Sequence, residues 1–150
     1  MATRETHIKI ARRHKYFIDF TCQSVEHYPD KCSPDVFCVW FVVASYYRTI
    51  HLLEAIFDKY ELGHAVPTNE EEADSRRNGL LRKLELPLIR KEIKILRRFA
   101  LHAKYLPDDA VFDYDVITQL DKTRDRIVNG VLARIEKLTA EVLGVSIVDI

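Results

Sequence analysis

The sequence predicts an all-α protein that folds as a five-helix up-and-down bundle, with residues 1–150 forming a single domain. Three observations support this fold class. Apolar residues recur every three or four positions over long stretches, proline and glycine fall between these stretches, and the whole chain has only 4 Gly and 5 Pro. With 47% hydrophobic and 31% charged residues, the composition also excludes disordered and collagen-like proteins.

The first predicted helix covers the residues from Thr3 to His27 and ends before Pro29. Its apolar residues alternate with basic ones, which is typical of an amphipathic helix. Its apolar positions are Ile10, Phe17 and Phe20, with Ile18, Val25 and basic residues between them.

The second predicted helix begins at Ser33-Pro34-Asp35, where a capping hydroxyl is followed by a proline and an acid in the first turn. We expect it to run to Leu62 and to stop at Gly63. Its β-branched and aromatic start would also suit a strand, but the apolar residues keep a 3.6-residue period over six turns, which favours a helix. These residues are Val39, Val43, Tyr46, Ile50, Leu53 and Phe57.

Three more helices are expected in the second half. An acidic run from Glu70 to Asp74 favours the N-terminus of a short third helix, which ends at Leu86-Pro87. The fourth covers Pro87 to Leu106, and the last runs from about Asp113 to Leu143, with Gly144 as its C-terminal signal. The apolar stripe of the fourth is Ile89, Ile93, Leu96 and Ala100; that of the last is Val116, Leu120, Ile127, Val131, Ile135, Leu138 and Val142.

Charge is balanced overall but not along the chain. There are 23 basic and 23 acidic residues, so no net charge draws the protein to nucleic acid. Residues 76–104, however, hold ten basic and two acidic residues, whereas residues 54–74 hold seven acids and one lysine. The basic segment is either a solvated helix face or a surface for phosphate.

Several classes of site and location are not indicated. No apolar run is long enough for a membrane span and the N-terminus lacks a signal-peptide core, so we expect a cytoplasmic protein without membrane contact. Cys22, Cys32 and Cys38 lack metal-ligand or disulfide spacing, so we expect buried thiols. No metal site and no cofactor motif is predicted.

One face of the second helix carries polar and aromatic side chains beside its core stripe. At about 100° per residue, one ridge contains Trp40, Ala44, Tyr47, His51, Glu54 and Ala55. A half-buried His and Glu need partners, and Arg76 or Arg77 of the third helix is the expected one. The ridge is either a structural polar network or a pocket for a ligand or nucleotide.

This ridge resembles a pattern of the HEPN (higher eukaryotes and prokaryotes nucleotide-binding) family. The stretch WFVVASYYRTIHLLEA, from Trp40 to Ala55, resembles W-x6-Y-x3-H-x2-E-A of one HEPN branch. Further on, Gly63-His64, Arg77-Asn78 and Ala103-Lys104-Tyr105 resemble that branch's Gly-x-His loop, Glu-Arg-Asn helix start and Ala-Arg-Tyr. The resemblance implies a HEPN-like bundle, and a ligand site formed by Trp40, Tyr47, His51, Glu54, Arg77 and Tyr105.

Many HEPN domains are metal-independent ribonucleases, often dimeric, whose motif is Arg, four to six residues, then His. Arg97 and His102 fit its shortest form. Residues four apart lie closer round a helix than residues five apart, so Arg98 is the arginine beside His102. Arg97 flanks the apolar stripe, but its long side chain could reach round the helix, so either arginine remains a candidate. The same projection places Arg98, His102, Lys91 and Ile95 on the side away from that stripe, where an isoleucine suggests a partner surface. The histidine would exchange protons with ribose and leaving oxygen, and the arginine would hold the phosphate.

The resemblance thus implies a nucleic-acid-associated domain, with a metal-independent endoribonuclease of a toxin-antitoxin or defence system as one reading. Its partners would be RNA or a nucleotide, a second copy of the chain, and a protein such as an antitoxin. The alternative is a catalytically silent module for nucleotide binding or protein assembly. Salt-dependent binding without turnover would distinguish it from the enzyme.

Overall fold

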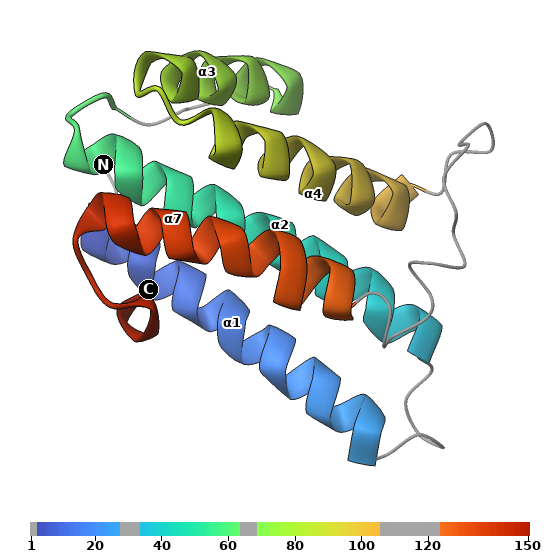
Figure 1. Ribbon diagram of the computed structural model, residues 1–150. Coiled ribbons are helices and arrows are strands. Elements are labelled where there is room, and N and C mark those ends of the chain that lie inside the picture. Colours follow the sequence, from blue (N-terminus) through green and yellow to red (C-terminus); the bar gives the residue numbers. More distant parts are fainter. Residues whose placement is uncertain (1–2, 28–33, 64–68, 106–123) are drawn as a thin grey trace.

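The computed structural model describes residues 3–27, 34–63, 69–105 and 124–150. Every regular element in these segments is a helix, and the helices pack as a bundle (Figure 1), so the predicted all-α bundle is confirmed. The elements are α1 (Arg4–His27), α2 (Pro34–Lys59), α3 (Glu70–Lys83), α4 (Pro87–Tyr105), η1 (Arg124–Leu132), α7 (Ala133–Leu143) and η2 (Ile147–Asp149).

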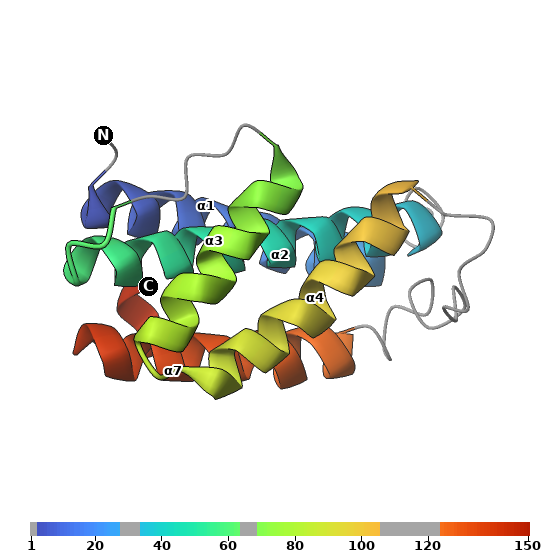
Figure 2. The same cartoon turned by 90° about the horizontal axis from the view of Figure 1, so that it is seen from above.

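The second helix is the centre of the bundle. α2 packs against α1, α4 and α7, and α1 and α2 run antiparallel side by side. Figure 2 shows α3 and α4 crossing the α1–α2 pair at one side while α7 lies along another. Both sides of α2 are therefore partly covered, and its polar residues must be paired or must face a groove.

The helix ends agree with the local signals in the sequence, with small shifts. α2 ends at Lys59, three residues before the predicted Leu62. The left-handed residue that closes it is Glu61, with φ +56°, and the next N–H, of Leu62, bonds back to the Phe57 carbonyl at 3.0 Å. Gly63, the predicted stop, is left-handed as well, with φ +70°, but lies beyond this closing turn. Asn69 caps α3 by accepting a hydrogen bond from the Glu72 main-chain N at 2.8 Å. The predicted cap Ser33 lies outside the described residues.

The last helix is described only in its second part. It begins as a π-helix over Arg124–Leu132 and continues as α7, while the predicted stretch from Asp113 lies outside the described residues. Gly144 ends it with φ +72°, and its N–H bonds to the Ala140 carbonyl, as the sequence predicts. The tail, unclassified from sequence, forms one short turn, and Ile150 docks into the core.

The predicted apolar stripes of α2 and α4 are buried. In the described part of the core they contribute Val43, Tyr46, Ile50, Leu53, Phe57, Ile89, Ile93, Leu96 and Ala100, and the last helix adds Ile127, Val131 and Ile135. The period of 3.6 residues therefore identified the inward face of three helices.

The apolar side predicted for α1 is wrong. Phe17 and Phe20 are 43% and 64% exposed, and Ala11, Ile18 and Thr21 face the core instead. Small side chains let α1 approach α2 closely, and the Thr21 hydroxyl donates to the Phe17 carbonyl at 2.6 Å, so it can be buried at little cost. The two phenylalanines lie about 100° or more from Ile18 round the helix.

No helix in the part of the chain that the structure describes has the length and apolar character needed to span a membrane.

Candidate functional site

The predicted ridge of α2 runs from an open end to a closed one. Trp40 and Tyr47 are 57% and 37% exposed, His51 is half-buried, and Glu54 is 4% exposed. The shared face follows from the helical spacing, as predicted. The aromatic end is therefore accessible to solvent, and the carboxylate end is enclosed.

The first helix adds two histidines that the sequence reasoning missed. The Nδ1 atoms of His7 and His51 are 3.1 Å apart, within hydrogen-bond distance. The His14 ring is stacked with those of His51 and Tyr47, with ring centres 5.7 and 6.1 Å away and interplanar angles of 18° and 19°. The seven-residue spacing of His7 and His14 was the available signal, because it places both on one side of α1.

Burial favours the uncharged forms of His51 and His14. Desolvation, and next the nearby His7, His14 and Arg77, lower the pKa of His51 from 6.5 to about 4. Desolvation, and next the Arg48 charge, also lower the pKa of His14. At neutral pH these two side chains therefore behave as uncharged planar rings with one donor and one acceptor nitrogen each.

The closed end of the ridge is held by α3. Arg77 Nε donates to Glu54 Oε1 at 3.1 Å, which confirms the predicted arginine partner. Arg77 Nη1 also lies 3.5 Å from Asp74 Oδ1, and Tyr46 Oη donates to the same oxygen at 3.2 Å. Arg97 of α4 forms an ion pair with Asp74 as well. Asp74 thus joins α2, α3 and α4.

The two arginines of the expected ribonuclease motif have different environments. Arg97 points inward to its ion pair with Asp74, whereas Arg98 is exposed on the outer side of α4. This agrees with the helix projection that placed Arg98, and not Arg97, on the outer side. His102 and Tyr105 belong to α4, but their side chains lie outside the described residues, so their pairing stays a prediction.

Two smaller expectations are corrected. Ile95, expected on the outer side of α4 as a sign of a partner surface, is half-buried and packs against the core. Cys22 is half-buried rather than buried. Its position on α1 beside the buried Thr21 leaves one side open to solvent. The side chains of Cys32 and Cys38 lie outside the described residues.

Arg48 forms a second polar cluster, on the side of α2 next to α7. Its side chain is 0% exposed, and its Nη1 donates to the Ala11 carbonyl at 2.7 Å. Its Nε bonds to Glu136 Oε1 at 2.7 Å, and its Nη2 donates to the Ile150 main-chain oxygen at 3.1 Å. No pattern in the sequence predicted that this arginine, one turn before His51 and Leu52, would be wholly buried.

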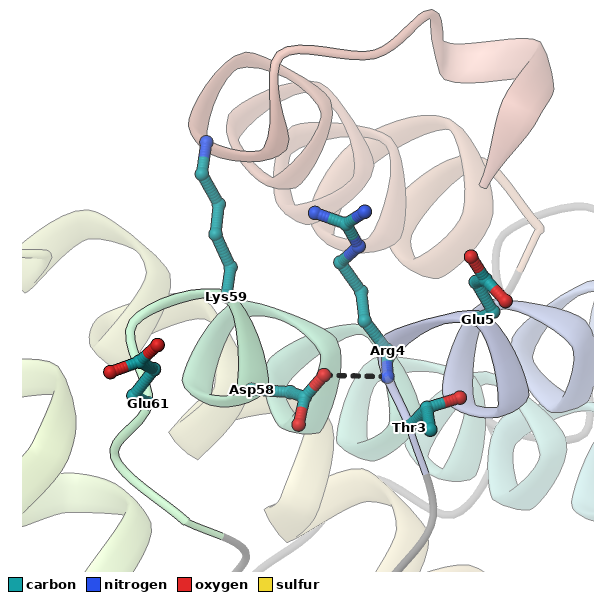
Figure 3. Close-up of a pocket in the computed structure, with 6 residues that line it drawn as sticks. All are labelled: Thr3, Arg4, Glu5, Asp58, Lys59 and Glu61. Carbon is teal, nitrogen blue, oxygen red and sulfur yellow. Dashed lines mark hydrogen bonds between the residues drawn. The ribbon is translucent and has the colours of Figure 1, made fainter.

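Among the described residues, no group of three or more His, Cys, Asp or Glu is arranged to hold a metal ion. A cavity of about 320 Å³ lies where α1 begins and α2 ends (Figure 3). It is lined by Thr3, Arg4, Glu5, Asp58, Lys59 and Glu61.

Two of the charged residues that line this cavity have partners within the protein. Asp58 accepts a hydrogen bond from the Arg4 main-chain N at 2.7 Å, which caps α1. Lys59 Nζ donates to the Val142 carbonyl at 2.6 Å, near the end of α7. In Figure 3 the Arg4 and Lys59 side chains extend to the same side of the cavity, away from the capping bond. Because the lining charges are of both signs and bond to other parts of the protein, we infer that they hold the helix ends together and do not form a ligand site.

Comparison of the chain with models of protein families, with curated proteins and with solved structures gave no match.

Proposed function

We propose that this chain is a HEPN-like nucleic-acid-binding domain that contacts RNA phosphates through the outer side of α4. The observation that carries the proposal is a row of exposed cations on that helix. The row consists of Lys91, Lys94 and Arg98 and is called the basic row below.

The spacing of the basic row suits a polyanion. Its members are three and four residues apart, so they lie on one side of α4 and span about 10 Å at 1.5 Å per residue. The acids nearest to it are engaged elsewhere: Glu92 pairs with Arg134 at 2.8 Å, and Asp74 pairs with Arg97. Because these two carboxylates of the described residues already have cationic partners, they compete less with a phosphate chain for the basic row.

Cleavage would use the pair Arg98 and His102. They are four residues apart on α4, so the backbone places them on the same side of the helix. The histidine would move a proton to or from the ribose and the leaving oxygen, and the guanidinium would hold the phosphate, without a metal. A homodimer would bring two such pairs together, and an antitoxin-like protein could cover them in a toxin-antitoxin or defence system.

The first experiment is incubation of the purified protein with labelled single-stranded RNA and transfer RNA in EDTA. We expect cleavage by the wild type and none by His102→Ala or Arg98→Ala. Arg97→Ala serves as a structural comparison, and its melting temperature must be measured because it loses the Asp74 ion pair. Cleavage that survives in His102→Ala would refute the catalytic assignment.

Binding is tested apart from cleavage by the fluorescence anisotropy of labelled RNA at several salt concentrations. Lys94→Glu should weaken binding roughly three- to tenfold and reduce the slope of log affinity against log salt by about 1. The matched control is Lys137→Glu, an exposed lysine on α7. Equal affinity of both variants for RNA would refute phosphate binding by the basic row. Salt-dependent binding without cleavage would favour the catalytically silent nucleotide-binding module.

A further inference from the structure

Four aromatic side chains remain exposed on α1 and α2, the two helices that pack antiparallel. They are Phe17 and Phe20 of α1 and Trp40 and Tyr47 of α2, called the aromatic face below. Single exposed apolar residues are normal on a protein surface. Four exposed rings on two helices that pack against each other exceed what scattered single residues explain, and exposed apolar surface of this kind often has a binding role.

Contacts between the two helices fix where these rings lie. α1 and α2 are antiparallel, with His7 against His51 and His14 stacked on Tyr47. Phe17 follows His14 by three residues on the same side of α1, and Trp40 precedes Tyr47 by seven on the same side of α2. Phe17, Trp40 and Tyr47 therefore lie on the same sides of α1 and α2 as the histidine contacts.

The His14 ring is stacked with two rings of α2. It lies within 18° of parallel to the His51 ring and within 19° of parallel to the Tyr47 ring. His51 and His14 are held in the uncharged form by burial, which makes their rings good stacking surfaces. Tyr47 is 37% exposed, so a planar group of a ligand can reach part of its ring.

The charge beside the aromatic face selects the kind of partner. Arg13 is exposed and lies one turn before Phe17, whereas Asp19 lies about 160° from Phe17 round α1. A second copy placed symmetrically on this face would bring two such arginines toward each other. A nucleic acid strand would instead supply phosphates for Arg13 and bases for the rings.

We propose that the aromatic face binds the unpaired bases of single-stranded RNA, with Arg13 at the accompanying phosphate. This rests on the proposed function and adds a substrate preference to it: the basic row binds phosphates of any strand, and the aromatic face requires bases free to stack. Proteins that bind single strands without strong sequence preference combine cations and aromatic platforms in this way.

Trp40 is the only tryptophan in the chain, so its intrinsic fluorescence reports on the aromatic face directly. The wild type is titrated with a single-stranded oligouridylate, a duplex RNA of equal length and inorganic polyphosphate. We expect quenching by the single strand only. Phe20→Ala should weaken single-strand binding about fivefold or more and leave polyphosphate binding unchanged. The matched control is Tyr60→Ala, which removes an exposed aromatic ring at the far end of α2.

The outcomes separate this inference from the proposed function. One outcome is that RNA and polyphosphate both bind in anisotropy assays while Trp40 fluorescence stays constant and Phe20→Ala keeps its affinity for RNA. That result would refute base binding by the aromatic face and leave phosphate binding by the basic row intact. If neither polyanion binds, the proposed function fails and this inference with it. If Trp40 emission changes with protein concentration and Phe20→Ala abolishes a dimer in sedimentation, the face is an interface between copies and the RNA proposal is refuted.

Discussion

The central helix carries a polar cluster on each of two sides, and the clusters differ in how fully they are closed. Next to α7, Arg48 is wholly buried, and its three donor groups have partners in α1, in α7 and at Ile150. Next to α3, the rings of His14, His51 and Tyr47 are only half-covered. A fully paired buried group has no capacity left for a ligand, whereas the half-covered rings retain accessible faces.

The difference also appears in the charge state. A guanidinium stays protonated at any physiological pH, so its burial requires a carboxylate, and Glu136 supplies it. The histidines can lose their charge, and a lowered pKa permits burial without any carboxylate partner. The cluster of Arg48 and its three partners, called the Arg48 joint below, therefore stays charged and paired at physiological pH. The histidine cluster can change with pH or with a bound molecule.

The largest expected effect is the loss of the Arg48 joint. Arg48→Met should lower the free energy of unfolding by about 3–5 kcal/mol, because Glu136 and two main-chain carbonyls lose a buried charged partner. Urea denaturation measures it. Arg134→Met is the control, since its ion pair with Glu92 is exposed and is expected to cost below about 1 kcal/mol. Similar losses in both variants would contradict a special role for Arg48.

A smaller loss is expected at Asp74, on the other side of α2. Asp74→Asn keeps the size of the side chain but removes the negative charge that Arg77 and Arg97 share. We expect a loss of about 1–3 kcal/mol in unfolding free energy. Asp125→Asn, an exposed acid on η1, should change stability by less than about 0.5 kcal/mol. An Asp74 loss as large as that of Arg48 would mean that both clusters are equally closed.

Some features of these two clusters could be predicted from the sequence, and others could not. The Glu54–Arg77 pair was predictable, because a buried carboxylate on one helix face needs a cation and the next helix carries two adjacent arginines in its middle. The helix bounds were predictable from Pro, Gly and the 3.6-residue period. Both inferences need only the chain's local pattern.

The remaining features depend on the register and rotation of one helix against another. His7 and His14 meet His51 only because α1 is antiparallel to α2 at this register. The inward face of α1 was mispredicted for the same reason: hydrophobicity favoured Phe17 and Phe20, but close packing selected Ala11. Tertiary packing, which the sequence pattern does not encode locally, decided these positions.

The histidine cluster should make stability depend on pH. The unfolded His51 binds a proton near pH 6.5, whereas in the folded protein its pKa is about 4. Because the unfolded state takes up the proton first, the free energy of unfolding should fall as pH falls from about 6.5 to 4. Allowing for solvent screening of a half-buried group, the loss is about 1–2 kcal/mol.

The measurement is urea denaturation of the wild type and of His51→Gln at pH 7, 6 and 5. Glutamine can still hydrogen-bond to His7 but does not titrate, so the variant should lose less stability over this interval. The comparison between the two proteins removes the contribution of carboxylates, which titrate in both. Identical pH profiles would show that His51 is not the group responsible.

The smallest effect is expected at the cap of α3, the helix that closes the histidine side. Asn69→Ala removes the acceptor for the Glu72 N–H and should cost about 1 kcal/mol, because one main-chain donor in the first turn loses its partner. Asn129→Ala, an exposed asparagine within η1, is the control. Since α3 holds Arg77 against Glu54, its loosening should raise hydrogen exchange in α3 and move the pKa of His51 back toward 6.5. Exchange in α7, which contacts the Arg48 joint, should stay unchanged. A uniform increase in both helices would show that the two sides of α2 open together, and the distinction between a closed joint and an open cluster would fail.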